Sequence, residues 1–599
     1  MAWRRRSGET GLVVSTILVA LAATSGASAS SAPSSIGPGC DLSQAAVAHR
    51  GGGAVIVPQP PGAPVACHVS TGFAAAESHL VVTNSGAIVF TPAVLPSGAA
   101  GTGEGPSVAG TTDANAVPAA MLISRDQGGH WSVIKPFGVT WNPTDHADYV
   151  DPATGRLFYE DYGPIPLAPA LGSGQDGPAH VMWSEDEGAT WHHTVIPSLL
   201  LTENPRFTSA PAPAGQPPPV GYPDITYFCA NTNVGFTSPL IAGRVCFKSL
   251  DGGTTWAQTT ILFNGTLPRH PECGTSGEIY SAVDGYYPAP TSDGALYLLV
   301  ACGGHTYLAR STDEASSFPI VRAASGQPVS LALPIDSITT AIGSGPQLRI
   351  DPAGNFYLLY PEVNGSTLTK LWLRVSRDRG QTWGSPVDIT APGVTAILRW
   401  AVAEQGQGNL GVAYLGQRRG QTTFDGYLTQ TRDALSPAGP LLWSAVVSDP
   451  AQPLMYGRMI EGAGFITGPD GVEVPVPFPL GVQPVGGQVS AGFDFIGAAI
   501  APDGTAWASF AQDCGPTPNA PKCEAQNDQT RGLAARLVLA SATPATPAPP
   551  GGPLAPGGPP SRPPSALPAT GATSGARLWE VTAALALAVL TLRLRRRHP

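Results

Sequence analysis

Charged side chains are scarce in this chain. Asp, Glu, Lys and Arg make up 12% of its 599 residues, and acids outnumber bases by 42 to 32. Without residues 1–29 and the segment after Thr570, 24 bases and 40 acids remain, a net charge near −16. Such a chain is a poor partner for nucleic acid or for anionic membrane surfaces.

Several patterns that carry chemistry are also missing. The sequence has no sustained helical periodicity, no Cys-x-x-Cys pair, no Gly-x-Ser-x-Gly, no phosphate-binding loop and no dinucleotide fingerprint, and its histidines share no metal-binding spacing. Instead, 72 glycines and 63 prolines break short apolar runs. This pattern predicts strands and turns, and it excludes coiled coils and helical bundles.

One phrase, Ser-x-Asp-x-Gly-x-x-Trp or a close variant, occurs five times at steps of 60 to 65 residues. A fixed period of this size indicates repeated supersecondary units. The carboxylate is expected to accept backbone N–H bonds within a turn, and the glycine to supply a positive φ. The fourth copy has Ala315 and Phe318 in place of Gly and Trp, so its turn is expected to be looser. The aspartates are Asp126, Asp186, Asp251, Asp313 and Asp378.

A second pattern, strand–turn–strand, recurs about every 60 residues. It occurs in 79–90, 148–161, 223–231, 286–301, 348–360, 400–416 and 498–510. Seven hairpins of this kind predict an all-β fold, a β-propeller with seven blades favoured over six. The last two units lack the full phrase; Thr431-Arg432-Asp433 begins it and breaks off.

The five phrases resemble the Asp-box, or bacterial neuraminidase repeat, of sialidases and of many propellers that are not enzymes. This resemblance implies that the five aspartates stabilise blade turns away from any catalytic centre. It also implies what a sialidase-type site would need: three arginines for the sugar carboxylate, a tyrosine nucleophile with a glutamate, and an aspartic acid.

The family's N-terminal Arg-Ile-Pro phrase is absent, and Arg50 stands in an unrelated context, HRGGG. Later arginines are available, and Tyr456 lies close to one of them and to Glu461. The alternative for Tyr456, surrounded by Met, Leu and Ile, is a place in the core. The catalytic candidates are Tyr456, Glu461, Arg349, Arg399 and Arg458, with Arg206 as a further arginine.

Three aspartates, Asp148, Asp224 and Asp494, precede what are expected to be the first strands of their units. In a propeller these positions would form a ring near one mouth of the central channel and would hold a cation such as calcium. The alternative is that they are turn or cap residues. No other cofactor is predicted.

Eight cysteines in an exported chain predict disulfides. Pairing between neighbours in sequence gives Cys40–Cys67, Cys229–Cys246, Cys273–Cys302 and Cys514–Cys523.

The two ends of the chain resemble export and anchoring signals. Residues 1–29 have three arginines, an apolar run and small residues, as in a secretory signal peptide. Residues 567–599 contain Leu567, Pro568, Thr570 and Gly571 in LPATG, then an apolar segment and a basic tail. This order resembles the cell-wall sorting signal of Gram-positive surface proteins, which implies cleavage by a sortase after Thr570 and attachment to a wall precursor. A simple membrane anchor is the alternative.

The predicted organisation is a signal peptide (1–29), a propeller head (30–540), a Pro/Ala/Gly-rich disordered stalk (541–566) and the sorting signal (567–599). We expect an extracellular protein, attached to the wall or membrane of a Gram-positive-type bacterium. It would present a surface that binds a glycan or a protein. The alternative is an exo-acting sialidase-type glycoside hydrolase, and a purely structural surface protein is a third reading.

Overall fold

The structure is a computed structural model that describes residues 37–92, 121–136, 146–162, 178–233, 241–263, 270–279, 287–333, 345–364, 367–460, 496–513 and 530–539, with gaps of one to four residues inside some of these ranges, and the three short strands 464–467, 473–476 and 481–483. All of these belong to the first of two compact units, 1–542. The predicted signal peptide, stalk, sorting signal and Cys514–Cys523 pair lie outside the described residues. Within the described part, no helix is long and apolar enough to cross a membrane.

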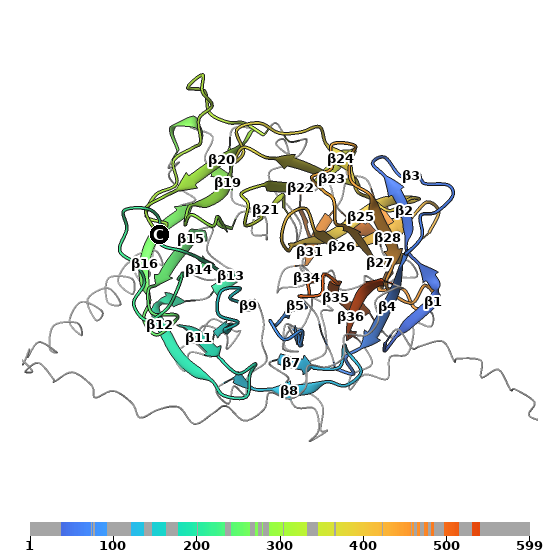
Figure 1. Ribbon diagram of the computed structural model, residues 1–599, viewed down its shortest axis with the longest axis horizontal. Coiled ribbons are helices and arrows are strands. Elements are labelled where there is room, and N and C mark those ends of the chain that lie inside the picture. Colours follow the sequence, from blue (N-terminus) through green and yellow to red (C-terminus); the bar gives the residue numbers. More distant parts are fainter. Residues whose placement is uncertain are drawn as a thin grey trace, which may run out of the picture. The chain divides into compact units, whose positions relative to one another are not determined.

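Seven antiparallel sheets surround one axis (Figure 1). We number these blades along the chain and give their strands from the innermost outward. Blade 1 is β5 (His79–Val82), β6 (Ile88–Thr91), β7 (Met121–Ser124) and β8 (Ser132–Ile134). Blade 2 is β9 (Ala147–Val150), β10 (Leu157–Tyr162), β11 (Pro178–Ser184) and β12 (His192–Leu200). Blade 3 is β13 (Thr202–Ala210), β14 (Ile225–Asn233), β15 (Ile241–Ser249) and β16 (Ala257–Phe263). Blade 4 is β18 (Ala289–Pro290), β19 (Leu296–Cys302) and β20 (His305–Ser311), with β17 (Glu278–Ile279) also on β19.

Blade 5 is β21 (Gln347–Ile350), β22 (Phe356–Asn364), β23 (Thr367–Ser376) and β24 (Val387–Asp388). Blade 6 is β25 (Val394–Glu404), β26 (Leu410–Arg418), β27 (Thr423–Thr431), β28 (Leu442–Val446), β2 (Val47–Arg50) and β3 (Ala54–Val55), with β29 (Met455–Tyr456) also on β27. Blade 7 is β34 (Gly497–Ile500), β35 (Ala506–Asp513), β36 (Thr530–Leu539), β4 (Pro64–Ser70) and β1 (Cys40–Ala45). The remaining elements are the pairs β30 (Arg458–Ile460) with β33 (Gly481–Gln483) and β31 (Gly464–Thr467) with β32 (Glu473–Val476), and a 3₁₀ turn, η3 (Pro271–Cys273).

The ring is closed, because each innermost strand contacts the innermost strand of the next blade, and β34 of blade 7 contacts β5 of blade 1. The core lies between blades. Alternate side chains of one strand point to opposite faces of its sheet, so Phe90 packs with Trp507 of blade 7 while Val89 packs with Tyr159 of blade 2. This two-sided burial explains the apolar runs of the middle strands, and it confirms the predicted seven-bladed all-β fold.

The N-terminal segment completes the last two blades. β4 pairs with β36 in blade 7, and β2 pairs with β28 in blade 6. The first strands of the chain are therefore outer strands of blades whose inner strands lie more than 300 residues later. This segment fastens the two ends of the ring together.

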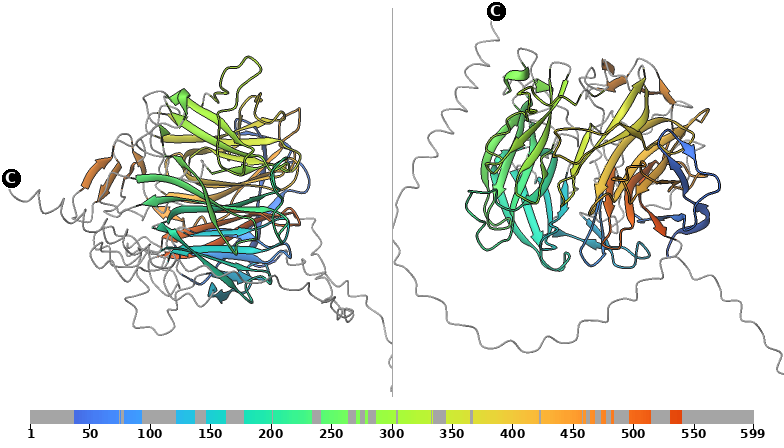
Figure 2. Two further views of the ribbon diagram at one scale, coloured as in Figure 1. Left: turned by 90° about the vertical axis from the view of Figure 1, so that its left-hand side faces the viewer. Right: turned by 45° about the horizontal axis from the view of Figure 1, so that its top comes forward.

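The ring has two different faces. Strands alternate in direction, so the connections between second and third strands and between successive blades lie on one face, here called the loop face. The chain leaves and re-enters the blades at this face in its longest connections, from Thr91 to Met121, from Tyr162 to Pro178 and from Val446 to Gly497. The opposite face, here called the turn face, carries only short connections, with the exception of 211–224 in blade 3. In the edge-on view of Figure 2, the short strands between 458 and 483 lie to one side of the blades.

The five phrases form equivalent turns that follow the third strand of blades 1, 2, 3 and 5 and β20 of blade 4, on the turn face. In each, the Ser hydroxyl donates to the Asp carboxylate at 2.8 or 2.9 Å, and the N–H four residues after Asp donates to the same carboxylate oxygen at 2.7 to 3.0 Å. The glycine has a positive φ in four copies, as predicted. In the fourth copy Ala315 adopts φ 61° and keeps the bond from its N–H to Ser311, so that turn is not open.

Each of these turns also contacts the preceding blade through the residue that follows its aspartate. Glu187 accepts hydrogen bonds from Thr83 and Ser85 of blade 1, and Arg379 donates to Asp293 of blade 4 at 2.6 Å. The carbonyl of Gln127 accepts from Arg536 of blade 7, and Glu314 pairs with Lys248 of blade 3. The variable position of the phrase therefore links neighbouring blades.

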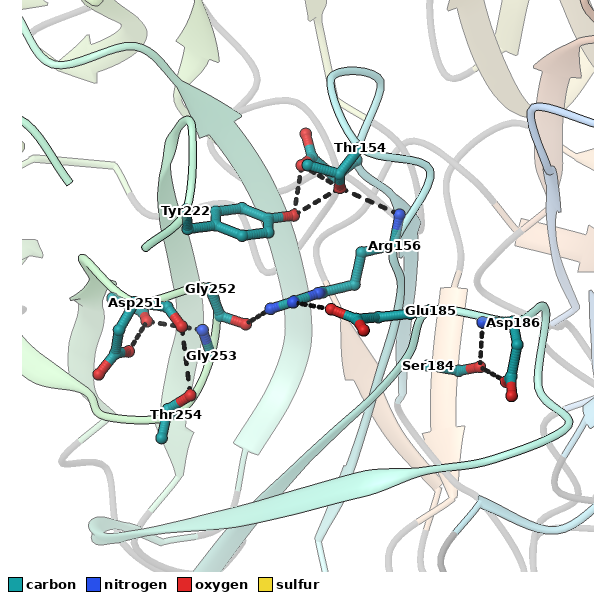
Figure 3. Close-up of polar contacts among 12 residues, drawn as sticks. Thr154, Arg156, Ser184, Glu185, Asp186, Tyr222, Asp251, Gly252, Gly253 and Thr254 are labelled. Carbon is teal, nitrogen blue, oxygen red and sulfur yellow. Dashed lines mark hydrogen bonds and ion pairs between the residues drawn. The ribbon is translucent and has the colours of Figure 1, made fainter. Parts of the chain in front are cut away.

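Figure 3 shows the link between blades 2 and 3. Arg156 donates to the Gly252 carbonyl of the blade 3 turn and pairs with Glu185, beside the blade 2 turn. Its guanidinium carbon lies 4.4 Å from the centre of the Tyr222 ring. One cation thus connects two turns and covers an aromatic ring.

Three of the four predicted disulfides are confirmed: Cys40–Cys67, Cys229–Cys246 and Cys273–Cys302. The first two join residues that face each other on paired strands, β1 with β4 and β14 with β15. The Cys40–Cys67 bond therefore lies inside the N-terminal segment that closes the ring.

Candidate functional site

A buried carboxyl group lies on the innermost strand of blade 2, toward the loop face. The Asp148 side chain is 2% exposed, and its Oδ2 accepts a hydrogen bond from the Thr91 hydroxyl of blade 1 at 2.7 Å. Nδ1 of His79, also in blade 1, lies 3.7 Å from Oδ1. Burial raises the pKa of Asp148 to about 6, against the opposing effects of the Thr91 bond and of Arg206. Asp148 can therefore gain or lose a proton near neutral pH.

Two histidines adjoin this carboxyl. The rings of His79 and His146 are 5.0 Å apart in an edge-to-face arrangement. Burial, followed by the charges of Arg206 and His146, holds the pKa of His79 well below its usual value. His79 is therefore neutral at pH 7, and it can exchange a hydrogen bond with a ligand without carrying charge.

Two arginines of blade 3 stand near the junction with blade 4. Arg206 is on β13, the innermost strand, and its Nη1 donates to the Pro205 carbonyl at 2.7 Å. Arg244, on β15, is fully buried. The guanidinium carbons of Arg206 and Arg244 lie 5.8 and 4.0 Å from the centre of the Tyr287 ring. Cation–π contacts of this kind fix the guanidinium groups in place.

We call these residues the loop-face cluster: His79, Thr91, His146, Asp148, Arg206, Arg244 and Tyr287. They come from blades 1 to 4, and Arg206 acts electrostatically on both Asp148 and His79. The cluster combines a carboxyl that titrates near pH 6 with fixed positive charge. Such a set can bind a polar ligand that carries a carboxylate, and it can transfer a proton.

The predicted ring of three aspartates is wrong in one member. Asp224 precedes β14, the second strand of blade 3, and not its first strand. It therefore lies on the turn face, where Asp151 helps burial to raise its pKa. The true first strand, β13, contains Pro205 and is separated from β14 by the proline-containing connection 211–224, which hid this hairpin. Asp148 lies toward the other face, and Asp494 is outside the described residues.

Among the described residues, no group of three or more His, Cys, Asp or Glu side chains is arranged to hold a metal ion. With Asp148 and Asp224 on different faces, the two described aspartates cannot share the cation that was expected between them.

The structure does not bring the predicted catalytic residues together. Nε of Arg349 donates to the Val402 carbonyl at 2.9 Å and Nη1 donates to the Leu348 carbonyl at 3.0 Å, so this arginine joins the innermost strands of blades 5 and 6. Arg399 is 3% exposed at an irregularity of β25, with φ 52°. Tyr456 pairs with Thr423 of β27, two strands outward from β25, and Arg458 lies on β30, in a different sheet. Glu461 is outside the described residues.

A second carboxyl with a raised pKa, which the sequence did not suggest, is the half-buried Glu404 at the turn-face end of β25. Burial, then Asp351, raises the pKa of Glu404 to about 8, while Arg349 opposes the shift. Asp351 itself accepts bonds from the Tyr357 hydroxyl at 2.7 Å and the Asn355 side chain at 2.8 Å. Asp351, the carboxylate that acts on Glu404, is therefore engaged by side chains of its own blade.

Two members of the loop-face cluster, Asp148 and Arg206, were candidates from the sequence, and the sequence carried a signal for two more. In the hairpins of blades 1 and 4, His79 and Tyr287 stand four residues before Thr83 and Thr291, which begin equivalent turns. Aligning the hairpins on these turns would have placed both side chains at one level of neighbouring innermost strands. No comparable sequence pattern predicts that Arg244, on β15 of blade 3, lies close to Tyr287.

No protein-family model and no curated protein matches this sequence. Among solved structures, it is similar to the NanB sialidase of Streptococcus pneumoniae, at 10% identity over 66% of this chain and 68% of that chain, with a TM-score of 0.34. It is also similar to the intramolecular trans-sialidase of Ruminococcus gnavus (12% identity, 78% and 97% covered, TM-score 0.32). A protein of unknown function from Dyadobacter fermentans gives 12% identity, 79% and 98% covered, and a TM-score of 0.32. At these values the likeness carries no argument, and the fold assignment rests on the sheets themselves.

Proposed function

We propose that this protein is a surface-attached propeller whose loop face binds a glycan that carries a carboxylate. The observation that supports this proposal is the loop-face cluster, in which Arg206 and Arg244 are fixed around Tyr287 beside Asp148. Guanidinium groups recognise carboxylates by paired hydrogen bonds. The longest connections begin at the same face, where binding loops would surround such a ligand.

A glycan-array screen of the purified secreted protein tests this proposal. Arg206→Gln is expected to weaken binding of acidic glycans by about 10- to 100-fold, because it removes a charge that pairs with the carboxylate. The matched control is Arg419→Gln, an exposed arginine in the β26–β27 turn that has no described partner, which should bind like the wild type. Equal binding by the Arg206 variant, or no saturable binding of any glycan, would contradict the proposal.

Hydrolysis is the second candidate function, and the pKa of Asp148 favours it. A carboxyl group whose pKa is near 6 is suited to protonate a glycosidic oxygen. A fluorogenic sialic-acid reporter tests for this activity. Release of the fluorophore that is lost in Asp148→Asn would support it, and no release above background would leave glycan binding as the function.

We further propose that the head is exported and joined to the cell wall through Thr570. The order of LPATG, apolar segment and basic tail in residues 567–599 supports this. Thr570→Ala is expected to move the protein from the covalently bound wall fraction to the membrane fraction, as measured by immunoblotting after wall digestion. A wild-type protein found only in the membrane fraction would instead indicate a simple membrane anchor.

A further inference from the structure

A cleft of about 350 Å³ lies between the outer parts of blades 5 and 6. One wall is formed by β23 and β24 of blade 5, and the other by the β2–β3 hairpin together with the connection before β28. Its volume is at the lower end of the roughly 300–1,000 Å³ of small-molecule sites. Its lining includes Arg50, Gly51 and Gly52 of the HRGGG segment, and the loop-face cluster gives the Arg50 side chain no role.

The glycines of this segment shape the cleft. A Cβ added to Gly51 would come within 2.9 Å of the Val387 Cγ1, so the hairpin packs directly on blade 5. A Cβ added to Gly52 would meet nothing within 4 Å, because this residue borders open space. The turn of the β2–β3 hairpin, Gly51 and Gly52, therefore lines the cleft with backbone alone, which leaves room for a ligand beside the Arg50 side chain.

An aromatic ring forms part of the opposite wall. The indole N–H of Trp372 donates to Glu362 Oε2 at 3.1 Å, which fixes the orientation of the ring. The Lys370 ammonium lies 5.1 Å from the ring centre. A pyranose ring has an apolar C–H face that packs on such a surface while its hydroxyl groups remain available for hydrogen bonds.

The charges in the cleft favour an anionic ligand. The carboxylate of Asp388, which is 6% exposed, accepts the Thr390 N–H at 3.0 Å and lies 3.6 Å from the Lys370 ammonium. The opposite charges of Lys370 and Asp388 cancel. Arg50 is exposed, and its single hydrogen bond among the described residues runs from Nη1 to the Gly439 carbonyl at 2.9 Å. Glu362 is bonded to Trp372 and Asp388 is paired with Lys370, so Arg50 is the exposed cation of the cleft lining that can pair with an anionic group of a ligand.

We propose that this cleft binds a pyranose sugar that carries a carboxylate, such as a uronic acid unit. Its ring would pack on Trp372, its carboxylate would pair with Arg50, and a hydroxyl would donate to Asp388. The site lies on outer strands and is independent of the loop-face cluster. Two separate sites on one head would allow it to bind a polymeric acidic glycan at two points and so raise its avidity.

Isothermal titration calorimetry of the full mature chain with α-1,4-digalacturonate tests the proposal. We expect saturable binding that is weakened at least 10-fold by Arg50→Gln and by replacing the probe with neutral α-1,4-galactobiose. Trp372→Phe should weaken binding about 5-fold. Arg419→Gln, the exposed control, should leave binding unchanged. Because the loop-face cluster would also bind an acidic glycan, Arg50→Gln is measured in the Arg206→Gln background as well, where the binding that remains should be lost with Arg50. Higher salt should reduce the affinity.

Three outcomes would overturn the proposal. One is the absence of binding at about 10 mM digalacturonate, a concentration well above that needed for even weak sites. Another is equal affinity for the neutral disaccharide, or wild-type affinity in Arg50→Gln when circular dichroism shows the variant folded. The third is binding of a synthetic peptide of residues 541–566 that Arg50→Gln and Trp372→Phe both abolish, because the cleft would then take the protein's own proline-rich segment.

Discussion

Deleting residues 30–70 behind the signal peptide is expected to prevent the head from folding. The deletion removes β4, whose residues Val65, Ala66 and Cys67 are at most 3% exposed, and it uncovers Leu533 and Leu537 of β36. Full burial of a large apolar side chain contributes about 1.5–3 kcal/mol. The total loss is then on the order of 10 kcal/mol, comparable with the 5–15 kcal/mol by which a typical domain is stable.

The loss has a second cause, because the same segment supplies β2 to blade 6. Without it, β28 of blade 6 and β36 of blade 7 both become edge strands with unpaired N–H and C=O groups, which favours aggregation. We expect no soluble secreted head, or a head without a cooperative thermal transition by differential scanning calorimetry. Deleting only residues 30–36, which precede the described strands, should leave the transition unchanged.

A variant in which β4 is moved to the C-terminal side of β36 tests whether the deletion fails because β36 has lost its partner strand or because the N-terminal residues are missing. In the native register Leu539 at the end of β36 faces Pro64 at the start of β4. A short turn after Leu539, followed by residues 64–70 with Cys67→Ser, therefore rebuilds the β36–β4 pair within one hairpin. Partial recovery of soluble protein is expected. A deletion variant that unfolds at the wild-type temperature would show that the ring does not depend on this segment.

Local signals account for what could be predicted from the sequence. Six of the seven hairpins are strand pairs with a short turn, and the five turns depend on bonds within eight residues, so each is visible in a short window. The disulfides Cys40–Cys67 and Cys229–Cys246 also join paired strands of one sheet, and Cys273–Cys302 joins the 3₁₀ turn η3 to β19 of the same blade. Pairing between neighbouring cysteines succeeded for this reason.

The remaining features depend on contacts between distant parts of the chain. Nothing in residues 47–50 indicates that they pair with β28, nearly 400 residues later. The position of Asp148 between His79 and Arg206 depends on how three innermost strands are offset along the axis, which no local pattern specifies. The cleft beside Arg50 cannot be predicted locally either. One wall belongs to blade 5, and the other is the β2–β3 hairpin, which takes its place only when β2 pairs with β28.

Asp148→Asn is expected to stabilise the head at pH 7.5, although it should weaken function at the loop face. Folding raises the pKa of this carboxyl from 3.8 to about 6, so the folded protein binds the proton more tightly than the unfolded chain. Below about pH 3 both states are protonated, and burial of the group carries no cost of desolvating a charge. Above pH 6 the folded state carries the full cost, about 3 kcal/mol at 1.36 kcal/mol for each pKa unit.

The neutral amide avoids this cost, and its oxygen can still accept the Thr91 hydroxyl. Urea denaturation of the wild type and of Asp148→Asn at pH 4, 5.5 and 7.5 should therefore show a difference that is small at pH 4 and grows to about 3 kcal/mol in favour of the variant. A gain in stability that accompanies a loss of ligand binding is the behaviour of a functional residue held in an unfavourable state.

Asp186→Asn is the matched control, and it should change stability in the opposite direction. The N–H and hydroxyl groups of Thr190 donate to the Asp186 carboxylate and lower its pKa, so this group stabilises the fold when ionised and loses that contribution as the pH falls. Its amide variant should be less stable than the wild type at pH 7.5, and the difference should shrink on acidification. If Asp148→Asn were destabilised at pH 7.5 in the same way, Asp148 would be one more structural acceptor, and the proposed role of the loop-face cluster would fail.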